Sequence, residues 1–420
     1  MGISNLNNFL RNNCPQIYEE IHISQYSYKK VAIDISLYLC KFKTVCGDRW
    51  LSAFINLISC LRKNEVHCVF IYDSGCVPEK EPERKERALQ REKMNEKVCK
   101  LEEALRKFHL TGEIDQILID LNNKKMFNKP PKSLLNKKEN SINMNYVEDC
   151  IIKMRSQIIQ ISPKDYILTK ELFKILNVPY FHAPLEAETT CSDLCKRGLV
   201  DAVLSEDTDV LAYGCPVFLS KINTTDSTCI RIKYPEMLSA LSLQSQEFLD
   251  LCIMCGTDYN KNIYKIGPEK AYKYLQKHSS IENISTCNPN IDISILNHVR
   301  IRQLFREYEE LNVKIPYCGT PDFQVLTEFF FKNNIKYSME VIKRCFINQI
   351  IIFEEEGKEG KEVENVEEKV EEVEEVEEVE EVEEVEEIEE IQNVEEVEEV
   401  EEVEKVEEVE DIEDLEVEED

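Results

Sequence analysis

The stretch PYFHAPLEAETTCSDLCKRGLVDAVLSEDTDVLAYG, residues 179–214, contains the pattern that decides the fold. An apolar segment at residues 178–183 is followed by a helix-forming segment from about residue 186 and then by the apolar run 200–205. Short apolar runs of this kind are typical of buried strands, and a helix between two of them is typical of a parallel strand pair. The stretch therefore predicts a strand–helix–strand unit.

The same alternation appears on both sides of this stretch. Upstream, apolar runs at 30–35 and 66–73 enclose the amphipathic segment WLSAFINLISCLRK, residues 50–63. Downstream, PVFLS (216–220) and TCIRIKY (228–234) read as short strands, and the chain to about residue 350 looks helical. Strands alternating with helices predict an α/β fold with a central, mostly parallel sheet flanked by helices.

Acidic residues close three of the expected strands. Asp34 ends VAID, Asp73 ends VHCVFIYD, and Asp207 ends VDAVLSED. A buried carboxylate is costly unless it is paired or metal-bound. Because open α/β sheets place their ligands at the carboxyl ends of strands, three such acids suggest a shared metal site.

Further acids join these three. Glu186 and Glu188, like Asp207 and Asp209, are two residues apart, a spacing that puts both side chains on one face of an extended segment. Each acid taken alone is more simply a structural or solvated residue. Together they favour hard cations such as Mg²⁺ or Mn²⁺, which prefer oxygen ligands. The full set of candidate metal ligands is Asp34, Asp73, Glu186, Glu188, Asp207, Asp209 and Asp258.

The net charge of −31 is distributed unevenly. Residues 354–420, largely Val-Glu-Glu repeats, carry 39 acidic residues and 4 lysines, whereas residues 1–353 carry 47 basic and 43 acidic residues. A three-residue repeat forms no lasting apolar stripe on a helix, so we expect the tail to be solvated and disordered or marginally helical. An alternative is that it competes with DNA for the basic body.

Several protein classes are disfavoured by the sequence. No apolar run approaches the roughly 18 residues of a membrane span, and residues 1–6 do not resemble a secretory signal, so we expect no membrane partner. Seventeen cysteines in such a chain favour free thiols in a reducing compartment.

Residues 179–214 resemble the internal segment of the structure-specific 5′ nucleases, the flap-endonuclease and XPG-like group. LCIMCGTDYNKNIYKIGPEKA (251–271) resembles that family's helix–two-turn–helix region, and MGISNL and VAIDIS (31–36) resemble its amino-terminal segment. The resemblance covers about residues 1–350. It implies a PIN-like nuclease core, a helical arch over 84–145 and a helix–two-turn–helix DNA-binding region.

The resemblance also implies roles for particular residues. The seven acids would hold two Mg²⁺ ions, with Mn²⁺ able to substitute, and Lys80 and Arg87 would position the scissile phosphate as catalytic residues. Without the resemblance, a solvated helix with salt bridges is the simpler interpretation of Lys80 and Arg87. Arch lysines such as Lys124 and Lys137 could line a phosphate path or belong to a disordered loop.

The resemblance assigns DNA contacts to the turn around Ile266-Gly267-Pro268. There a helix start could hold a DNA phosphate or a K⁺ ion. Lys265 stands where the family commonly has glycine, which puts the turn's geometry in question. The candidate DNA-binding residues are Gly2, Lys265, Gly267, Pro268 and Lys270.

We divide the chain into five parts on these grounds. They are an N-terminal nuclease segment (1–108), an irregular basic arch insert (109–160), an internal nuclease segment (161–234), a helix–two-turn–helix and helical region (235–353) and the acidic tail (354–420). Segment 122–145, with paired prolines, is expected to be irregular.

The resulting hypothesis is a Mg²⁺-dependent 5′ flap endonuclease acting on branched or flapped DNA in replication, repair or recombination. We expect a nuclear monomer, in the host nucleus if the chain is viral, and find no clear sliding-clamp motif. The alternatives are a non-catalytic DNA-junction scaffold, a Holliday-junction resolvase or a 5′–3′ exonuclease.

Overall fold

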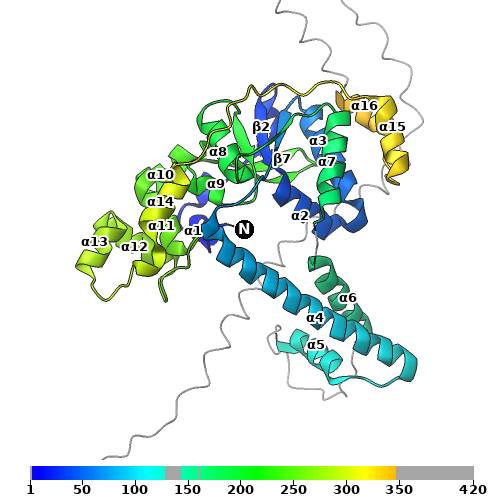
Figure 1. The fold of residues 1–420 in the computed structure, drawn as a ribbon, viewed down its shortest axis with the longest axis horizontal. Coiled ribbons are helices and arrows are strands. Elements are labelled where there is room, and N and C mark those ends of the chain that lie inside the picture. The colour runs from blue at the N-terminus through cyan, green and yellow to red at the C-terminus, as the bar shows by residue number, and fades with distance from the viewer. Residues whose placement is uncertain (1, 128–142, 159–160, 347–420) are drawn as a thin grey trace, which may run out of the picture. The chain divides into compact units, whose positions relative to one another are not determined.

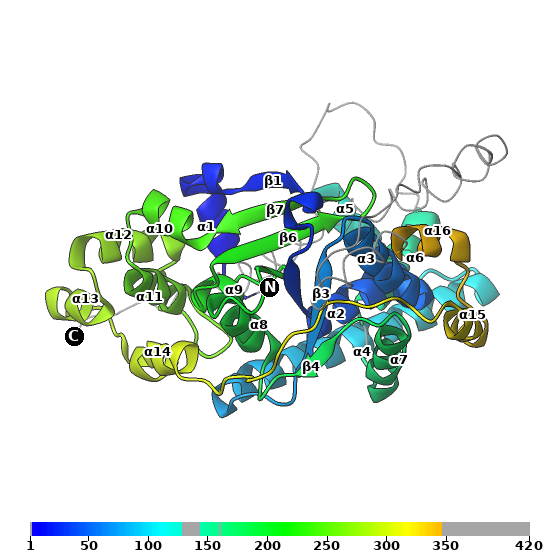
Figure 2. The same ribbon diagram turned by 90° about the horizontal axis from the view of Figure 1, so that it is seen from above.

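The computed structural model describes residues 2–127, 143–158 and 161–346, which belong to one compact unit, residues 1–352. Figures 1 and 2 show a central sheet with helices on both faces and a helical region beside it. The acidic tail and most of the basic part of segment 122–145 lie outside the described residues.

The sheet has the strand order β1-β7-β6-β5-β2-β3-β4. Strands β6, β5, β2, β3 and β4 are parallel, whereas β7 runs antiparallel to β6 and β1 (Figure 2). The predicted α/β fold with a mostly parallel sheet is therefore confirmed; β1, which has one buried apolar residue, was not predicted. The strands are β1 (Glu19–His22), β2 (Lys30–Asp34), β3 (His67–Tyr72), β4 (Tyr180–His182), β5 (Ala202–Leu204), β6 (Val217–Asn223) and β7 (Thr228–Lys233).

Two hydrophobic cores cover the two faces of the sheet. In β2, Val31 and Ile33 point into one core and Ala32 points into the other, as the two-residue period of a strand requires. A strand that is buried on both faces appears in the sequence as a continuous apolar run. These strands could therefore be predicted from the sequence. One core is built with α2 (Ile35–Cys46), α3 (Trp50–Lys63), α7 (Pro163–Ile175), α15 (Phe323–Lys332) and α16 (Met339–Phe346).

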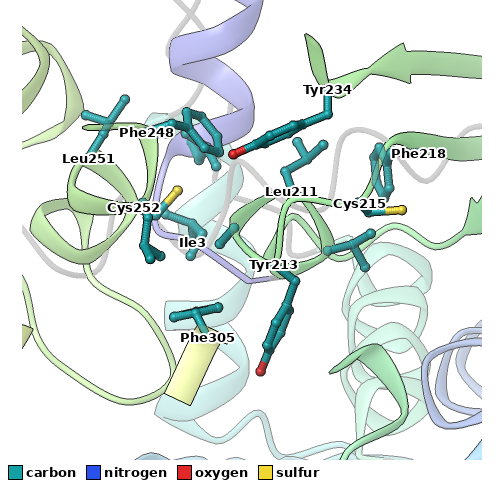
Figure 3. Close-up of a cluster of buried hydrophobic side chains, with 14 of the residues drawn as sticks. Ile3, Leu211, Tyr213, Cys215, Phe218, Tyr234, Phe248, Leu251, Cys252 and Phe305 are labelled. Carbon is teal, nitrogen blue, oxygen red and sulfur yellow. The ribbon is translucent and has the colours of Figure 1, made fainter. Parts of the chain in front are cut away.

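The other core joins the sheet to the helical region, as Figure 3 shows for its centre. Tyr213, Tyr234, Phe248 and Phe305 are buried there from segments far apart in the sequence. The contributing helices are α1 (Leu6–Asn13), α8 (Ala187–Lys196), α9 (Asp209–Ala212), α10 (Tyr234–Leu241), α11 (Ser245–Cys255), α12 (Pro268–His278), α13 (Ile281–Cys287) and α14 (His298–Arg306).

Helix α7 has a well-defined start. Ser162 and Asp165 form a reciprocal capping box, and Pro163 occupies the first turn. The proline lacks an N–H that would have no partner at that position, so it favours a helix start.

Helices α4 (Glu81–Thr111), α5 (Gln116–Phe127) and α6 (Met144–Gln157) form a separate group with a small core of their own (Figure 1). The expectation that segment 122–145 is irregular is wrong at its ends, because α5 extends to Phe127 and α6 begins at Met144. Leu118 and Leu121, three residues apart, pack against α4, and this tertiary contact outweighs the polar composition. Residues 128–142 lie outside the described part.

None of the helices that the structure describes combines the length and apolar character needed to cross a bilayer. The seventeen cysteines, all within the described ranges, are free thiols. Short 3₁₀ turns occur at Pro15–Ile17, Ile23–Tyr26, Gly47–Arg49, Pro78–Lys80 and Ser294–Leu296.

Candidate active site

The candidate site lies where β5, β2 and β3 end. These three strands are adjacent and parallel, so their carboxyl ends share one edge of the sheet. Asp34 is the last residue of β2, Asp73 follows β3 directly, and Asp207 lies three residues after β5. Asp34 also caps α2, because its Oδ1 accepts a hydrogen bond from the Ser36 backbone N–H at 2.8 Å.

Asp73 ties β3 to the start of α8. Its Oδ1 accepts from the Ala187 backbone N–H at 2.7 Å, and its Oδ2 accepts from the Ser36 hydroxyl at 2.5 Å. This contact brings Glu186, in extended backbone before α8, and Glu188, in the first turn of α8, to the same edge. The sequence reasoning missed Ser36, because its hydroxyl contacts Asp73, which follows another strand, and no local pattern signals such a contact.

Asp207 and Asp209 flank the start of α9. The Asp209 backbone N–H donates to Asp207 Oδ1 at 2.9 Å. Both carboxylate oxygens of Asp209 are buried, and among the described residues neither has a hydrogen-bond partner. Such an orphaned buried carboxylate is what a cation-binding site would explain.

Gly2 lies against this pair and is partly buried. Its φ of +87° is unfavourable for residues with a side chain, and a Cβ there would be 2.2 Å from Asp207 Oδ1. We therefore infer that Gly2 allows the amino-terminal segment to approach the acids.

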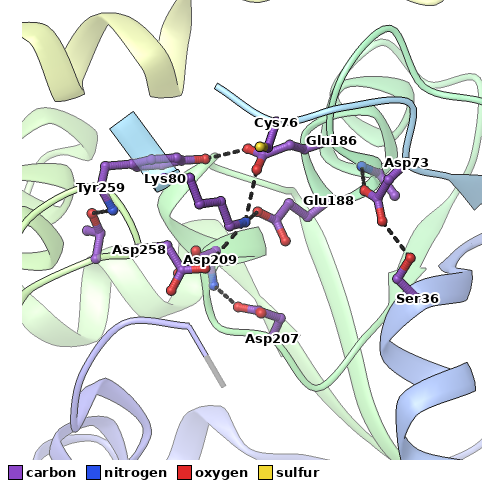
Figure 4. Close-up of polar contacts among 12 residues, drawn as sticks. Ser36, Asp73, Cys76, Lys80, Glu186, Glu188, Asp207, Asp209, Asp258 and Tyr259 are labelled. Atoms are coloured by element: carbon purple, nitrogen blue, oxygen red, sulfur yellow. Dashed lines mark hydrogen bonds and ion pairs between the residues drawn. The ribbon is translucent and has the colours of Figure 1, made fainter. Parts of the chain in front are cut away.

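Lys80 is at the centre of the acidic cluster (Figure 4). Its Nζ lies 3.0 Å from Glu186, 3.1 Å from Glu188 and 3.3 Å from Asp258. Arg87 lies on α4, seven residues after Lys80. Its guanidinium contacts Asp258 at 2.5 Å and Glu83 at 2.9 Å. The structure therefore places both predicted basic residues directly beside the predicted acids.

The pKa shifts of the buried carboxyl groups in the cluster indicate that they have too little positive charge around them. Burial, followed by the neighbouring charge of Asp73, raises the pKa of Asp34 to about 8. Burial is also the largest cause of the raised pKa of Glu188, Asp207 and Asp209, and other carboxylates add to it for each. Burial alone would lower the pKa of Lys80, but Glu188, Glu186 and Asp258 outweigh it, so the net pKa is raised.

This donor set fits hard divalent cations in chemistry and in charge. Within the described ranges, however, no group of three or more His, Cys, Asp or Glu side chains is already arranged to hold a metal ion. The Lys80 ammonium lies between the carboxylates that would otherwise converge. Binding of a metal ion would therefore require Lys80 to move aside.

The predicted DNA-binding turn precedes α12. Lys265 has a left-handed φ of +61°, so it adopts the conformation for which the family's glycine is suited. The Lys270 Nζ donates to the Lys265 carbonyl at 3.0 Å and stabilises the turn. Gly267 caps α12, Pro268 is its first residue, and the space beside Gly267 is open.

Two protein-family models match the segments that build this site. The XPG N-terminal domain matches residues 1–94, and the XPG I-region matches residues 177–258. A probable RAD2-like endonuclease, 369L, of Invertebrate iridescent virus 6 is 35% identical over 381 residues, covering 82% of this chain and 92% of the relative. The chain belongs to the XPG/RAD2-like endonuclease family.

Other members of the family extend this relationship. Flap endonuclease 1-A of Sorghum bicolor is 28% identical over 347 residues, covering 80% of this chain and 83% of the relative. The catalytic core of Rad2 in complex with DNA substrate has a TM-score of 0.56 at 15% identity, covering 83% of this chain and 99% of that chain. The XPG/RAD2-like fold predicted from the sequence is confirmed.

Proposed function

We propose that this XPG/RAD2-like chain is a divalent-metal-dependent, structure-specific DNA endonuclease that cleaves phosphodiester bonds in flapped or branched duplexes. One observation carries the proposal: acids from distant segments meet at one sheet edge around Lys80, where the Asp209 oxygens have no hydrogen-bond partner within the part of the chain that the structure describes. A scaffold protein would gain nothing from this electrostatic cost.

Asp34, Asp73, Glu186 and Glu188 would hold or orient one Mg²⁺ ion. Glu188, Asp207, Asp209 and Asp258 would serve a second, with Mn²⁺ able to substitute. When bound, the two ions would polarise a water molecule and offset the charge on the leaving oxygen. The chain's own part is to concentrate carboxylates at this edge of the sheet.

Lys80 and Arg87 would act on the phosphate. Both lie at the start of α4 and both contact acids in this structure. When the acids take up cations, the ammonium and guanidinium groups would be released to face the scissile phosphate. There they would stabilise the negative charge that develops in the transition state.

The turn before α12 would bind the DNA backbone at a position distant from the point of cleavage. Lys265 and Lys270 offer positive charge, and open space at Gly267 lets a phosphate or a K⁺ ion approach the backbone of the turn. The flap preference is supported by the similarity to flap endonuclease 1-A and to the Rad2 core that binds DNA.

A cleavage assay of the full chain tests the proposal. Labelled 5′-flap, bubble, nicked and four-way substrates would be incubated with Mg²⁺ or with EDTA, and we expect Mg²⁺-dependent cleavage at the flap base. Preference for four-way DNA would instead indicate a resolvase, and mononucleotide products an exonuclease. Absence of cleavage on every substrate would favour a scaffold.

Two variants test the metal assignment within that assay. Asp207→Asn and Asp73→Ala should abolish cleavage while flap binding stays largely intact. Asp226→Asn, in the exposed β6–β7 hairpin, is the matched control and should cleave normally. Unchanged turnover in either site variant would show that the metal assignment is wrong.

A further inference from the structure

Tyr259 connects the helical region to the acidic cluster. It follows Asp258 directly, and its ring is buried with its centroid 5.4 Å from that of Phe305 on α14. The Tyr259 hydroxyl donates to Glu186 Oε2 at 2.7 Å (Figure 4). The loop that contains Asp258 and Tyr259 thus supplies one acid of the cluster and a hydrogen-bond donor to another acid, Glu186.

The direction of each hydrogen bond that joins Tyr213, Tyr259 and Glu186 follows from the protons these groups carry. A phenol has one proton, and the Tyr259 hydroxyl donates it to Glu186. The 2.8 Å contact between the hydroxyls of Tyr213 and Tyr259 must then have Tyr213 as its donor. Burial is the largest cause of the raised pKa of both tyrosines, so both keep their protons near neutral pH.

The two oxygens of Glu186 therefore have different partners. Oε2 accepts from Tyr259, while Oε1 lies 3.0 Å from the Lys80 ammonium. Because Lys80 is the cation inside the acidic cluster, Oε1 is the oxygen that faces the position of positive charge. Tyr259 thus engages the oxygen of this carboxylate that is not paired with Lys80.

We propose that Tyr259, supported by Tyr213, is a positioning residue that restricts Glu186 to one-oxygen ligation and so favours Mg²⁺ over Ca²⁺. This inference rests on the proposed function, in which Glu186 is a metal ligand. Mg²⁺ requires near-ideal octahedral geometry, whereas the larger Ca²⁺ accepts two oxygens from one carboxylate. A fixed one-oxygen ligand suits the smaller ion.

The tyrosine pair also links the metal site to α14. Phe305 packs against both rings, with centroid distances of 4.6 Å to Tyr213 and 5.4 Å to Tyr259. Figure 3 shows Tyr213 and Phe305 in the shared core, together with Tyr234. Tyr234 is buried nearby, but its hydroxyl contacts Ser245 at 3.0 Å, so it offers the same chemical group without a bond to an acid.

The test is metal binding to the full chain without DNA, measured by calorimetry with Mg²⁺ and with Ca²⁺. Tyr259→Phe removes one hydroxyl and keeps the ring against Phe305. We expect Mg²⁺ affinity to fall by about tenfold, the lower end of the range for losing a hydrogen-bond partner of a ligand. Ca²⁺ affinity should change less, because Glu186 could then bind Ca²⁺ through both oxygens.

Matched variants separate positioning from simple loss of stability. Tyr213→Phe should weaken Mg²⁺ binding only a few-fold, since its hydroxyl does not touch Glu186, and Tyr234→Phe should leave both affinities unchanged. Equal losses for Mg²⁺ and Ca²⁺ in Tyr259→Phe, or no loss of either, would overturn the inference. In those cases intact flap cleavage by the unmodified chain would still support the proposed function, whereas unaltered metal binding by Glu186→Gln would count against that function itself.

Discussion

At the scale of single residues, Lys80 has the most consequential position. Its ammonium lies beside carboxylates of the acidic cluster, and its charge opposes the rise in the pKa of Glu188 that burial, above all, produces. A buried charge whose partner is removed is strongly destabilising. Lys80 therefore has a structural role before cations bind and, by our proposal, a catalytic role afterwards.

We predict that Lys80→Met lowers the free energy of unfolding in EDTA by about 3 kcal/mol, because several carboxylates lose their shared cation. Added Mg²⁺ should recover more stability in this variant than in the unmodified chain, since the ion no longer has to displace an ammonium. Flap cleavage should fall by about 10²-fold. Urea titrations with and without Mg²⁺ measure the first two effects.

Lys85→Met, on the exposed surface of the same helix, is the control for Lys80→Met and should behave as the unmodified chain. Equal responses of Lys80→Met and the unmodified chain to Mg²⁺ would contradict the stabilising role.

At the scale of elements, an ion-pair network holds three helices of the helical region together. Arg302 on α14 donates two bonds, at 2.7 and 2.6 Å, to the fully buried Asp250 on α11. It also contacts Glu282 on α13 at 2.5 Å. The hydrogen bond from Arg302 lowers the pKa of Glu282 to about 2.

The sign of the resulting pH dependence is defined by the lowered pKa. A carboxyl group with a folded-state pKa below its ordinary value of 4.5 stabilises the fold above that ordinary value. This contribution is lost as the pH falls from about 4.5 towards 2. Because Glu282 is half exposed, we predict that Glu282→Gln costs only about 0.5 kcal/mol at pH 7.

Urea unfolding of Glu282→Gln at pH 7 and near pH 2 measures this effect, and the difference from the unmodified chain should shrink at the lower pH. Glu309→Gln, at an exposed glutamate, provides the comparison. A difference that grows on acidification would disprove the assignment.

Helices α4, α5 and α6 form a second element-scale unit. Their small core contains Val98, Leu101 and Leu118, all fully or almost fully buried. We predict that Leu101→Ala destabilises this group locally by about 2 kcal/mol, because it leaves a cavity in a core with few members. Hydrogen exchange should speed up in α5 and α6, while β2 and β3 stay protected.

Leu89→Ala, at a half-exposed leucine of the same helix, should leave exchange unchanged. Matching loss of protection in the sheet of Leu101→Ala would mean that the three helices do not unfold as a separate unit.

At the scale of the whole molecule, charge is divided between a weakly basic body and an acidic tail. Residues 354–420 carry 39 acidic side chains and 4 lysines. Polyanionic segments compete with DNA phosphates for basic surfaces, and this competition weakens with salt. We predict that deleting 354–420 tightens non-specific DNA binding, most strongly at low salt.

Fluorescence anisotropy with a plain duplex over a range of salt concentrations compares the full and truncated chains. The two affinities should approach each other as salt rises. Equal affinities at low salt would rule out competition by the tail.

The sequence by itself determined the sheet apart from β1, because strands buried on both faces must be continuous apolar runs. It also indicated the seven acids and, through family resemblance, Lys80 and Arg87. Local patterns did not predict α5 and α6, although the resemblance implied a helical arch over 84–145, because their polar segments are helical through the packing of Leu118 and its neighbours on α4.

Only the tertiary structure decided how the site residues pair. Lys80 lies among Glu186, Glu188 and Asp258, and Tyr259 donates to Glu186, although these residues come from three separate segments. Local sequence patterns report the backbone conformation of a single segment. Hydrogen-bond and ion-pair partners depend on distances between segments, and these are fixed only when both cores have packed.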